Sequence, residues 1–214
     1  MKTTLTRCLA GGLALTLAAC GTVAGDDGDV VTTDRPAAEM AVADFTLEDT
    51  NGDEHTLSDY LADGKTVVLE WFNPDCPYVV AWHGGETDRM AGVYGDVRDE
   101  DLVWLAINSG AEGKQGAGLE RNKKAVADWK MPYPVLMDMS GETGMAYGAK
   151  TTPHMFIITP DGELAYEGAI DDSGGRGESK VNFVAQALGE LREGKDVSVP
   201  KTKSYGCSVK YAKK

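Results

Sequence analysis

Residues 66–79 read TVVLEWFNPDCPYV, and this stretch decides the fold. Its first seven residues are mostly β-branched, aliphatic or aromatic, which is typical of a buried strand. The strand is expected to end at residues 73–75. Cys76 and Pro77 then open a helix that we expect to run to about Tyr94, since proline is favoured at the first helical position. The stretch therefore places a cysteine where a strand meets a helix.

The position of Cys76 favours a reactive thiol. The first turn of a helix carries free backbone amides and the positive end of the macrodipole, and both stabilise negative charge. The thiolate of Cys76 should therefore be more populated than that of an ordinary cysteine, and the thiolate is the nucleophilic form. The alternative is a small buried core residue. Prolines at positions 74 and 77 and the aromatic strand before them favour the reactive thiol.

Outside this junction, segments of strand character alternate with segments of helical character. The glycine-rich loop 109–118 lacks the spacing of a phosphate cradle and is expected to border the mouth of the site. The sequence predicts one α/β domain over residues 41–214, with a central mixed sheet flanked by helices. The expected strands are 45–47, 66–72, 102–107, 135–136, 154–159 and 164–168, and the expected helices are 58–61, 77–94, 125–129 and 181–191, with a helical turn around residue 147.

Residues 1–19 are expected to be a lipoprotein signal peptide, with a short basic region followed by an apolar run of small residues. Residues 17–20 (LAAC) resemble a bacterial lipobox, which implies that Cys20 becomes the lipid-bearing first residue of the mature chain. Residues 20–40 are expected to form a flexible tether. We therefore expect an exported protein, lipid-anchored on the periplasmic side of the cell envelope, and Gly21 favours the outer membrane.

The net charge argues against one class of partner. The chain has 34 acidic and 21 basic residues, a formal charge of −13, and no basic stretch is long enough to follow a phosphate backbone. Nucleic acid is therefore not an expected partner.

Two of the four cysteines are expected to remain as free thiols in the mature domain. Cys8 leaves with the signal peptide and Cys20 takes lipid, so Cys76 and Cys207 remain in an exported domain. Two thiols in an oxidising compartment usually take part in redox chemistry or form a disulfide. The pair is open to redox chemistry, to a permanent structural disulfide within the chain, and to a bridge between two chains.

Four segments together carry a resemblance to a known family. They are WFNPDCPYV (71–79), INSGAEGKQG (107–116), TTPHMFIITPDGELAYEGAIDD (151–172) and KTKSYGCSVKY (201–211). The set resembles the peroxiredoxin-like branch of the redoxin, or alkyl hydroperoxide reductase and thiol-specific antioxidant, family. The resemblance covers nearly all of residues 41–211 and implies a thioredoxin-like fold.

The resemblance also implies a thiol-based antioxidant activity that needs no cofactor. Cys76 would reduce a peroxide, and Cys207 would resolve the resulting sulfenic acid as a disulfide that an external thiol reductant reduces. The substrate class is a hydroperoxide or a disulfide. Pro153 is expected to be a cis-proline opposite Cys76, exposing the backbone of Thr152 for pairing with an extended substrate or reductant.

Departures from the family pattern bear on the mechanism. Val79 stands where thioredoxins have their second cysteine, so a local dithiol mechanism is excluded. Asn73 stands where peroxiredoxins typically carry a threonine, and we expect it to donate a hydrogen bond to a peroxide oxygen or to the thiolate. No arginine close in sequence can be assigned the electrostatic role that arginine has in that family.

Three other functions stay open. Thiol-disulfide exchange with a protein partner is the first. Binding of copper or another soft metal by Cys76 with His83, His154 or Met155 is the second. It is disfavoured because about 10 Å of helix separates Cys76 from His83 and because lone histidines are commonly exposed, so no metal site is assigned. A non-catalytic binding module is the third, and the intact Cys76 argues against it. The oligomeric state is left open.

Overall fold

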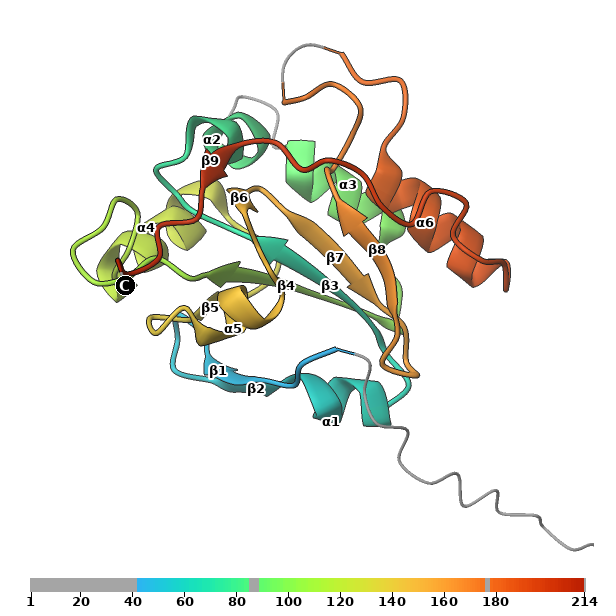
Figure 1. Ribbon diagram of the computed structural model, residues 1–214, viewed down its shortest axis with the longest axis horizontal. Helices are drawn as coiled ribbons and strands as arrows, with labels where there is room; N and C mark the ends of the chain where they lie inside the picture. Colours follow the sequence, from blue (N-terminus) through green and yellow to red (C-terminus); the bar gives the residue numbers. More distant parts are fainter. Residues whose placement is uncertain (1–41, 85–88, 176–177, 214) are drawn as a thin grey trace, which may run out of the picture. The chain divides into compact units, whose positions relative to one another are not determined.

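The computed structural model describes residues 42–84, 89–175 and 178–213 (Figure 1). The expected signal peptide, the expected lipid-attachment residue Cys20 and the expected tether up to residue 40 lie outside the described residues. None of the described helices is both long and apolar enough to cross a bilayer.

A mixed five-stranded sheet forms the centre of the domain, in the order β5-β4-β3-β7-β8. β3 runs parallel to β4, and β4 runs parallel to β5, whereas β7 is antiparallel to both β3 and β8. The central mixed sheet expected from the sequence is therefore confirmed. The strands are β3 (Thr66–Trp71), β4 (Leu102–Asn108), β5 (Val135–Met137), β7 (Met155–Ile158) and β8 (Leu164–Gly168).

The sheet separates two apolar clusters because side chains alternate along a strand. On one face, Val68 and Phe72 join the buried cluster that includes residues from α2 (Pro77–His83), α3 (Arg89–Val97), α4 (Leu119–Trp129) and α6 (Phe183–Arg192). On the other face, Val67, Leu69 and Trp71 pack with α1 (Leu57–Ala62). Cys76 belongs to the first cluster.

The helix expected from Pro77 to Tyr94 is instead described as two helices, α2 and α3. α2 ends at His83, and the amide of Gly84 closes its last turn on the Val80 carbonyl oxygen at 2.7 Å. A Cβ at Gly84 would lie 3.0 Å from the Trp129 indole nitrogen, so α4 packs closely against this end of the helix. The short helix α5 (Glu142–Ala146) lies where a helical turn was expected.

Two small antiparallel pairs complete the fold. β1 (Thr46–Glu48) and β2 (Glu54–Thr56) form a hairpin whose turn contains Asn51 and Gly52. β6 (Thr151–Thr152) pairs with β9 (Cys207–Ser208), a pairing that the sequence analysis did not anticipate. Figure 1 shows the C-terminal segment crossing the top of the sheet so that β9 lies beside β6 and α2. This crossing brings the second cysteine to the strand-to-helix junction.

Candidate active site

Cys76 lies at the junction of β3 and α2, as the sequence predicts. It is the N-cap residue of α2, and Pro77 occupies the first helical position. The side chain is buried, with 1% of the residue exposed. Its Sγ donates a hydrogen bond to the backbone carbonyl oxygen of Thr152 at 2.9 Å. The thiol therefore faces the loop before β7 and not the solvent.

Asn73 holds the backbone loop that leads into Cys76. Its Oδ1 accepts a hydrogen bond from the Asp75 amide at 2.8 Å, and its Nδ2 donates to the Gln115 carbonyl oxygen at 2.9 Å. In return, Gln115 Nε2 donates to the Asp75 carbonyl oxygen at 3.0 Å. The loop 109–118 thus borders the site as expected. In this conformation Asn73 uses its side-chain amide to join two loops.

Arg121 reaches the same loop from the first turns of α4. Its Nε donates to Asp75 Oδ1 at 2.8 Å, and a terminal guanidinium nitrogen donates to the Pro74 carbonyl oxygen at 2.7 Å. Arg121 is distant from Cys76 in the chain, so proximity in sequence did not indicate it. The fold supplies it because α4 packs beside the N-terminus of α2.

The Thr152-Pro153 peptide bond is cis, as the resemblance implied. Thr152 is buried, and its Oγ1 finds no hydrogen-bond partner within the described part of the chain. The backbone of Thr152 was expected to be exposed for an extended partner. That expectation is wrong for this conformation, because Thr152 is paired with Cys207 across the β6–β9 ladder. The chain's own C-terminal segment occupies the backbone edge at Thr152.

Cys76 and Cys207 are both free thiols, and both lie at Thr152: Cys76 bonds to its carbonyl oxygen, and Cys207 is its partner across the β6–β9 ladder. Burial raises the pKa of Cys76, but hydrogen bonds outweigh it and leave the pKa below its ordinary value. The groups that would donate to the ionised Cys76 sulfur are the Thr152 side chain, the Cys207 thiol, and the backbone of Val79 and Cys207. Burial, followed by the hydrogen bond to Cys76 and its charge, raises the pKa of Cys207 to about 11. Cys76 is therefore the thiol of the pair that ionises at the lower pH.

His83 is buried, so the expectation of a solvent-facing side chain is wrong. Its Nε2 lies 2.8 Å from Oε1 of Glu70, a fully buried carboxylate near the end of β3. Tyr133 donates its hydroxyl to the other carboxylate oxygen at 3.0 Å, and Trp129 stacks on the imidazole with ring centroids 5.7 Å apart. A buried carboxylate needs such partners, which explains why the histidine turns inward.

His154 is also buried, again against expectation. Its Nδ1 accepts a hydrogen bond from the Lys150 amide at 3.3 Å, and its ring packs on Phe156 with centroids 4.5 Å apart. Burial lowers the pKa of His154 to about 4, with further lowering by Lys150 and Lys201. Within the described residues no group of three or more His, Cys, Asp or Glu side chains is placed to hold a metal ion.

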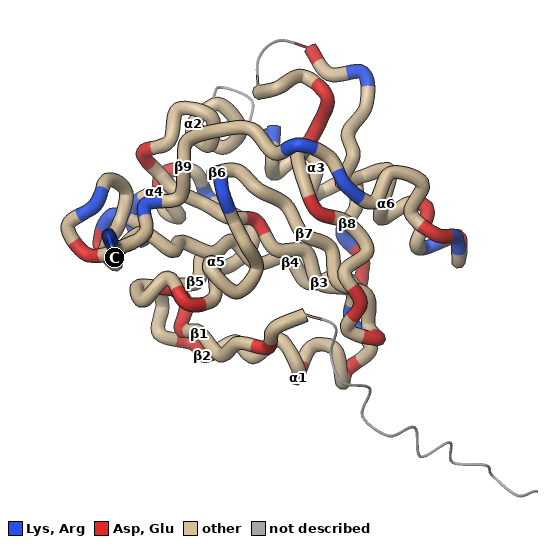
Figure 2. The backbone as a smooth tube through the Cα atoms, in the orientation of Figure 1, with Lys and Arg blue, Asp and Glu red and all other residues tan. Residues whose placement is uncertain are grey.

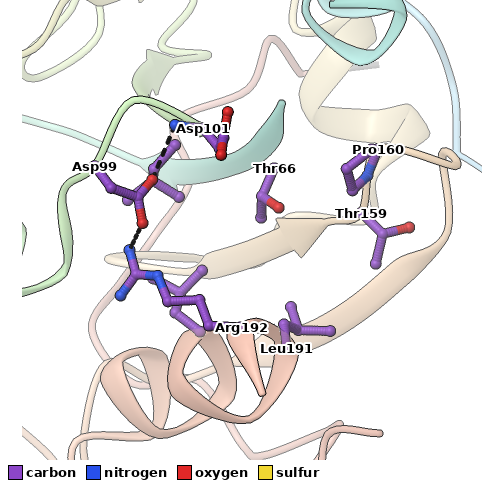
Figure 3. Close-up of a pocket in the computed structure, with 9 residues that line it drawn as sticks. Thr66, Asp99, Asp101, Thr159, Pro160, Leu191 and Arg192 are labelled. Carbon is purple, nitrogen blue, oxygen red and sulfur yellow. Dashed lines mark hydrogen bonds and ion pairs between the residues drawn. The ribbon is translucent and has the colours of Figure 1, made fainter. Parts of the chain in front are cut away.

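A cavity of about 360 Å³ lies at the other end of the central strands (Figure 3). It is lined by Thr66 and Leu102, where β3 and β4 begin, and by Thr159 and Pro160 after β7. Cys76 follows the opposite, carboxyl end of β3. Ligand sites of open α/β sheets lie at the carboxyl ends of the strands, so this cavity is not part of the cysteine site.

The sheet, the cysteine at the start of α2 and the cis-proline opposite it define a thioredoxin-like fold with a thiol redox site. The AhpC/TSA family matches residues 38–167. The chain belongs to this family. The match contains Cys76, Asn73 and the Thr152-Pro153 bond but ends before Cys207.

Two relatives carry the names of thiol redox proteins. Thiol-disulfide oxidoreductase ResA of Geobacillus kaustophilus is 28% identical over 128 residues, covering 60% of this chain and 67% of that protein. "Putative peroxiredoxin YkuU" of Bacillus subtilis is 24% identical over 139 residues, covering 62% and 76%. A crystal structure of a hypothetical protein from Sinorhizobium meliloti superposes with a TM-score of 0.70 and 30% identity, covering 81% of this chain and 93% of that chain. The protein is a thiol-dependent oxidoreductase.

Proposed function

We propose that this protein reduces hydroperoxides, with Cys76 as the nucleophile and Cys207 as the resolving thiol. One observation carries the proposal: the two free thiols meet at Thr152, and their pKa values are shifted in opposite directions. The low-pKa thiol attacks most readily, and the high-pKa thiol stays protonated until it is needed. No second cysteine in α2 competes, because Val79 stands at that position.

The first step forms a sulfenic acid. The Cys76 thiolate attacks one peroxide oxygen, the O–O bond breaks, and the remaining fragment takes up a proton and leaves as an alcohol, or as water from hydrogen peroxide. Sulfur is oxidised and the peroxide is reduced by two electrons. The Thr152 hydroxyl, buried and without a partner, is placed to donate a hydrogen bond to the thiolate before attack.

The second step forms a disulfide. The Cys207 thiol attacks the sulfenic sulfur of Cys76, the S–O bond breaks, and water leaves. A dithiol reductant then returns both cysteines to thiols by exchange through a mixed disulfide. The pairing of Cys207 with Thr152, whose carbonyl oxygen accepts the hydrogen bond from Cys76, favours this step over a second oxidation of Cys76. The resolving thiol is already held at the site when the sulfenic acid forms.

Thiol-disulfide exchange with a protein partner is the competing proposal, and the similarity to ResA favours it. The seated C-terminal segment argues for the peroxide instead. An extended polypeptide would pair with Thr152, where Cys207 already lies. A small oxidant needs no such edge.

The proposal is tested by stopped-flow oxidation of the reduced thioredoxin-like domain, residues 41–214, with hydrogen peroxide. Wild type is compared with Cys76→Ser and Cys207→Ser, and products are mapped by mass. We expect rapid sulfenic acid formation at Cys76, followed by a Cys76–Cys207 disulfide that is absent in both variants. A rate no faster than that of an ordinary thiol, with efficient reduction of a protein disulfide, would establish the competing proposal.

We also propose that the chain is exported and lipid-anchored through Cys20. The basic start, the apolar run and the LAAC sequence at residues 17–20 support this. Wild type and Cys20→Ser are expressed in a bacterial host and fractionated. Membrane recovery and labelling by a radioactive fatty acid are expected for wild type alone, and equal recovery of both forms in the soluble fraction would overturn it.

A further inference from the structure

The segment that carries Cys207 is bonded to the body of the domain on both sides of the cysteine. We call residues 200–211 the strap. Its upstream part lies along β8, and its downstream part lies against the residues before β6 and the loop after β4. The anchoring backbone hydrogen bonds run from Glu167 N to Pro200 O (2.9 Å), Thr202 N to Glu167 O (3.0 Å), Val209 N to Lys150 O (3.1 Å) and Ala111 N to Lys210 O (2.9 Å).

Charge helps to seat the strap. The whole chain is acidic, but the strap contains three lysines and no acidic residue. Figure 2 shows acidic residues scattered over the body and basic residues in the segment that leads to β9. The Lys201 ammonium lies 2.8 Å from the Glu167 carboxylate. One ion pair with the body of the domain therefore helps to hold the upstream part of the strap.

Tyr205, two residues before Cys207, is clamped by buried partners. Its hydroxyl donates to Oδ1 of the buried Asp171 at 2.8 Å and accepts from the Trp82 indole nitrogen at 3.1 Å. Arg89 lies 3.4 Å from the other oxygen of Asp171 and sits over the Trp82 ring at 3.9 Å. Trp82 belongs to α2, the helix that Cys76 opens. The clamp thus ties the strap to the helix of the nucleophile.

Gly206 brings the strap into close contact with the cis-proline loop. Its φ is +129°, in the region that favours glycine. A Cβ at this position would overlap the Thr152 carbonyl oxygen, the atom that accepts the hydrogen bond from Cys76. Only glycine lets the strap come this close, so the pairing of Cys207 with Thr152 depends on residue 206.

We propose that the strap occupies the place at Thr152 where an extended polypeptide substrate would otherwise pair. Tyr205 and Gly206 are the positioning residues that hold the strap there. The seated strap presents Cys207 to Cys76 and keeps other extended polypeptides off the Thr152 edge. The proposal rests on the proposed function and deepens it by naming the substrate class, small oxidants in preference to polypeptide disulfides. Specificity then resides in a segment beyond residue 167, where the family match ends.

Tyr205→Phe tests the clamp with the smallest change. It removes one hydroxyl and keeps the ring that packs beside Tyr78. The reduced protein is equilibrated in glutathione redox buffers, and the fraction with a Cys76–Cys207 disulfide is measured by mass. We expect the equilibrium constant for the disulfide to fall about tenfold, equivalent to about 30 mV, because a looser strap lowers the effective concentration of Cys207 at Cys76. Hydrogen exchange of the amides of residues 205–209 should become faster.

Tyr147→Phe is the matched control. It removes a tyrosine hydroxyl that donates to a backbone carbonyl oxygen, that of Ala43, on the other face of the sheet. Its disulfide equilibrium and its exchange at residues 205–209 should equal those of wild type. This assay uses no peroxide, so a failure of the peroxidase activity and a failure of the strap are separate results.

Gly206→Ala tests the exclusion of polypeptides, in a Cys207→Ser background that leaves Cys76 as the reacting thiol. The probe is an extended peptide whose single cysteine forms a mixed disulfide with thionitrobenzoate. Cys76 attacks the peptide sulfur, the S–S bond breaks, and thionitrobenzoate leaves and is followed by its colour. We expect the rate with the peptide, divided by the rate with dithiobisnitrobenzoate, to rise about tenfold as the edge opens.

Gly189→Ala is the control for the glycine change. It lies in α6 with helical φ, and no atom lies within 4 Å of its added Cβ. Its rate ratio should equal that of the Cys207→Ser parent. An unchanged disulfide equilibrium and unchanged exchange in Tyr205→Phe would overturn the proposal. An unchanged rate ratio in folded Gly206→Ala would also overturn it.

Discussion

Cys207 and Thr152 are paired residues of the β6–β9 ladder, and the carbonyl oxygen of Thr152 accepts the hydrogen bond from Cys76. One residue of the cis-proline loop thus contacts both thiols of the site. The consequence is that a substitution that removes the Thr152 hydroxyl or the Cys207 thiol is expected to alter the ionisation of Cys76.

Replacing Cys207 with serine or with alanine tests how far the Cys207 thiol lowers the pKa of Cys76. In Cys207→Ser a hydroxyl keeps a hydrogen-bond donor near the Cys76 sulfur, whereas Cys207→Ala has none. The pKa of Cys76 is therefore expected to rise more in Cys207→Ala, because the Cys207 thiol is one of the donors that lower it. The measurement is the ultraviolet absorbance of the thiolate as a function of pH. Equal titration curves for the two variants would contradict this.

The same two variants should differ from wild type in their final oxidation product. Without a resolving thiol, excess peroxide carries Cys76 from sulfenic to sulfinic acid, which adds a second oxygen. Intact-mass analysis after peroxide treatment should show that product in both variants and a disulfide in wild type. A sulfinic acid of equal yield in wild type would mean that Cys207 does not resolve.

Thr152→Val tests the buried hydroxyl at nearly constant volume. Loss of this donor raises the pKa of Cys76, since the Thr152 side chain is the largest of the contributions that lower it. A hydrogen bond to a charged group contributes about 1.5 kcal/mol, so alkylation of Cys76 at neutral pH should slow about tenfold. Thr152→Ser keeps the hydroxyl and should retain the wild-type rate. Equal slowing in both variants would assign the effect to packing instead.

The parts of the fold that could be predicted from the sequence are those with local signals. β3, the proline at the first position of α2 and the hairpin of β7 and β8 each have composition or turn residues that identify them. A cysteine at the end of such a strand then indicates the site. The split between α2 and α3 also had a local signal, the Gly84-Gly85 pair, which the expected single helix passed over.

The remaining features depend on contacts between distant residues. β6 and β9 have two residues each, which is too few to show the alternation of a strand. The sequence therefore did not indicate that they pair or that this pairing covers the backbone of Thr152. Arg121 reaches Asp75 only because α4 packs beside the site. The burial of His83 did have a signal, since Glu70 in an apolar strand requires a polar partner, but the sequence does not say which residue supplies it.

Arg121 is expected to position the loop before Cys76 with little effect on stability. Its ion pair with Asp75 is partly exposed, so Arg121→Gln should lower the free energy of unfolding by less than about 1 kcal/mol. The rate of Cys76 oxidation should fall by about three- to tenfold, because the Pro74 carbonyl oxygen loses its donor and the loop loosens. Arg121→Lys keeps the charge but lacks the planar guanidinium that donates to Asp75 and Pro74 at once. A wild-type rate in Arg121→Lys would show that charge alone is sufficient.

His154 should make the domain less stable as the pH falls. The folded protein holds its pKa near 4, mainly by burial, whereas the unfolded chain binds the proton near pH 6.5. Protonation between these values favours the unfolded state, so stability declines through this window, by up to about 3 kcal/mol. Lys150 and Lys201 add to the effect, and the charge of Glu167 opposes it.

His154→Gln removes this titration and leaves the other groups in place. In urea unfolding at several pH values, the stability advantage of wild type over His154→Gln should be constant above about pH 7 and shrink between pH 6.5 and 4. Below about pH 4 the difference should become constant again, because His154 is then protonated in both states. A difference that stays constant through the whole range would mean that the buried imidazole accepts its proton as readily as an exposed one.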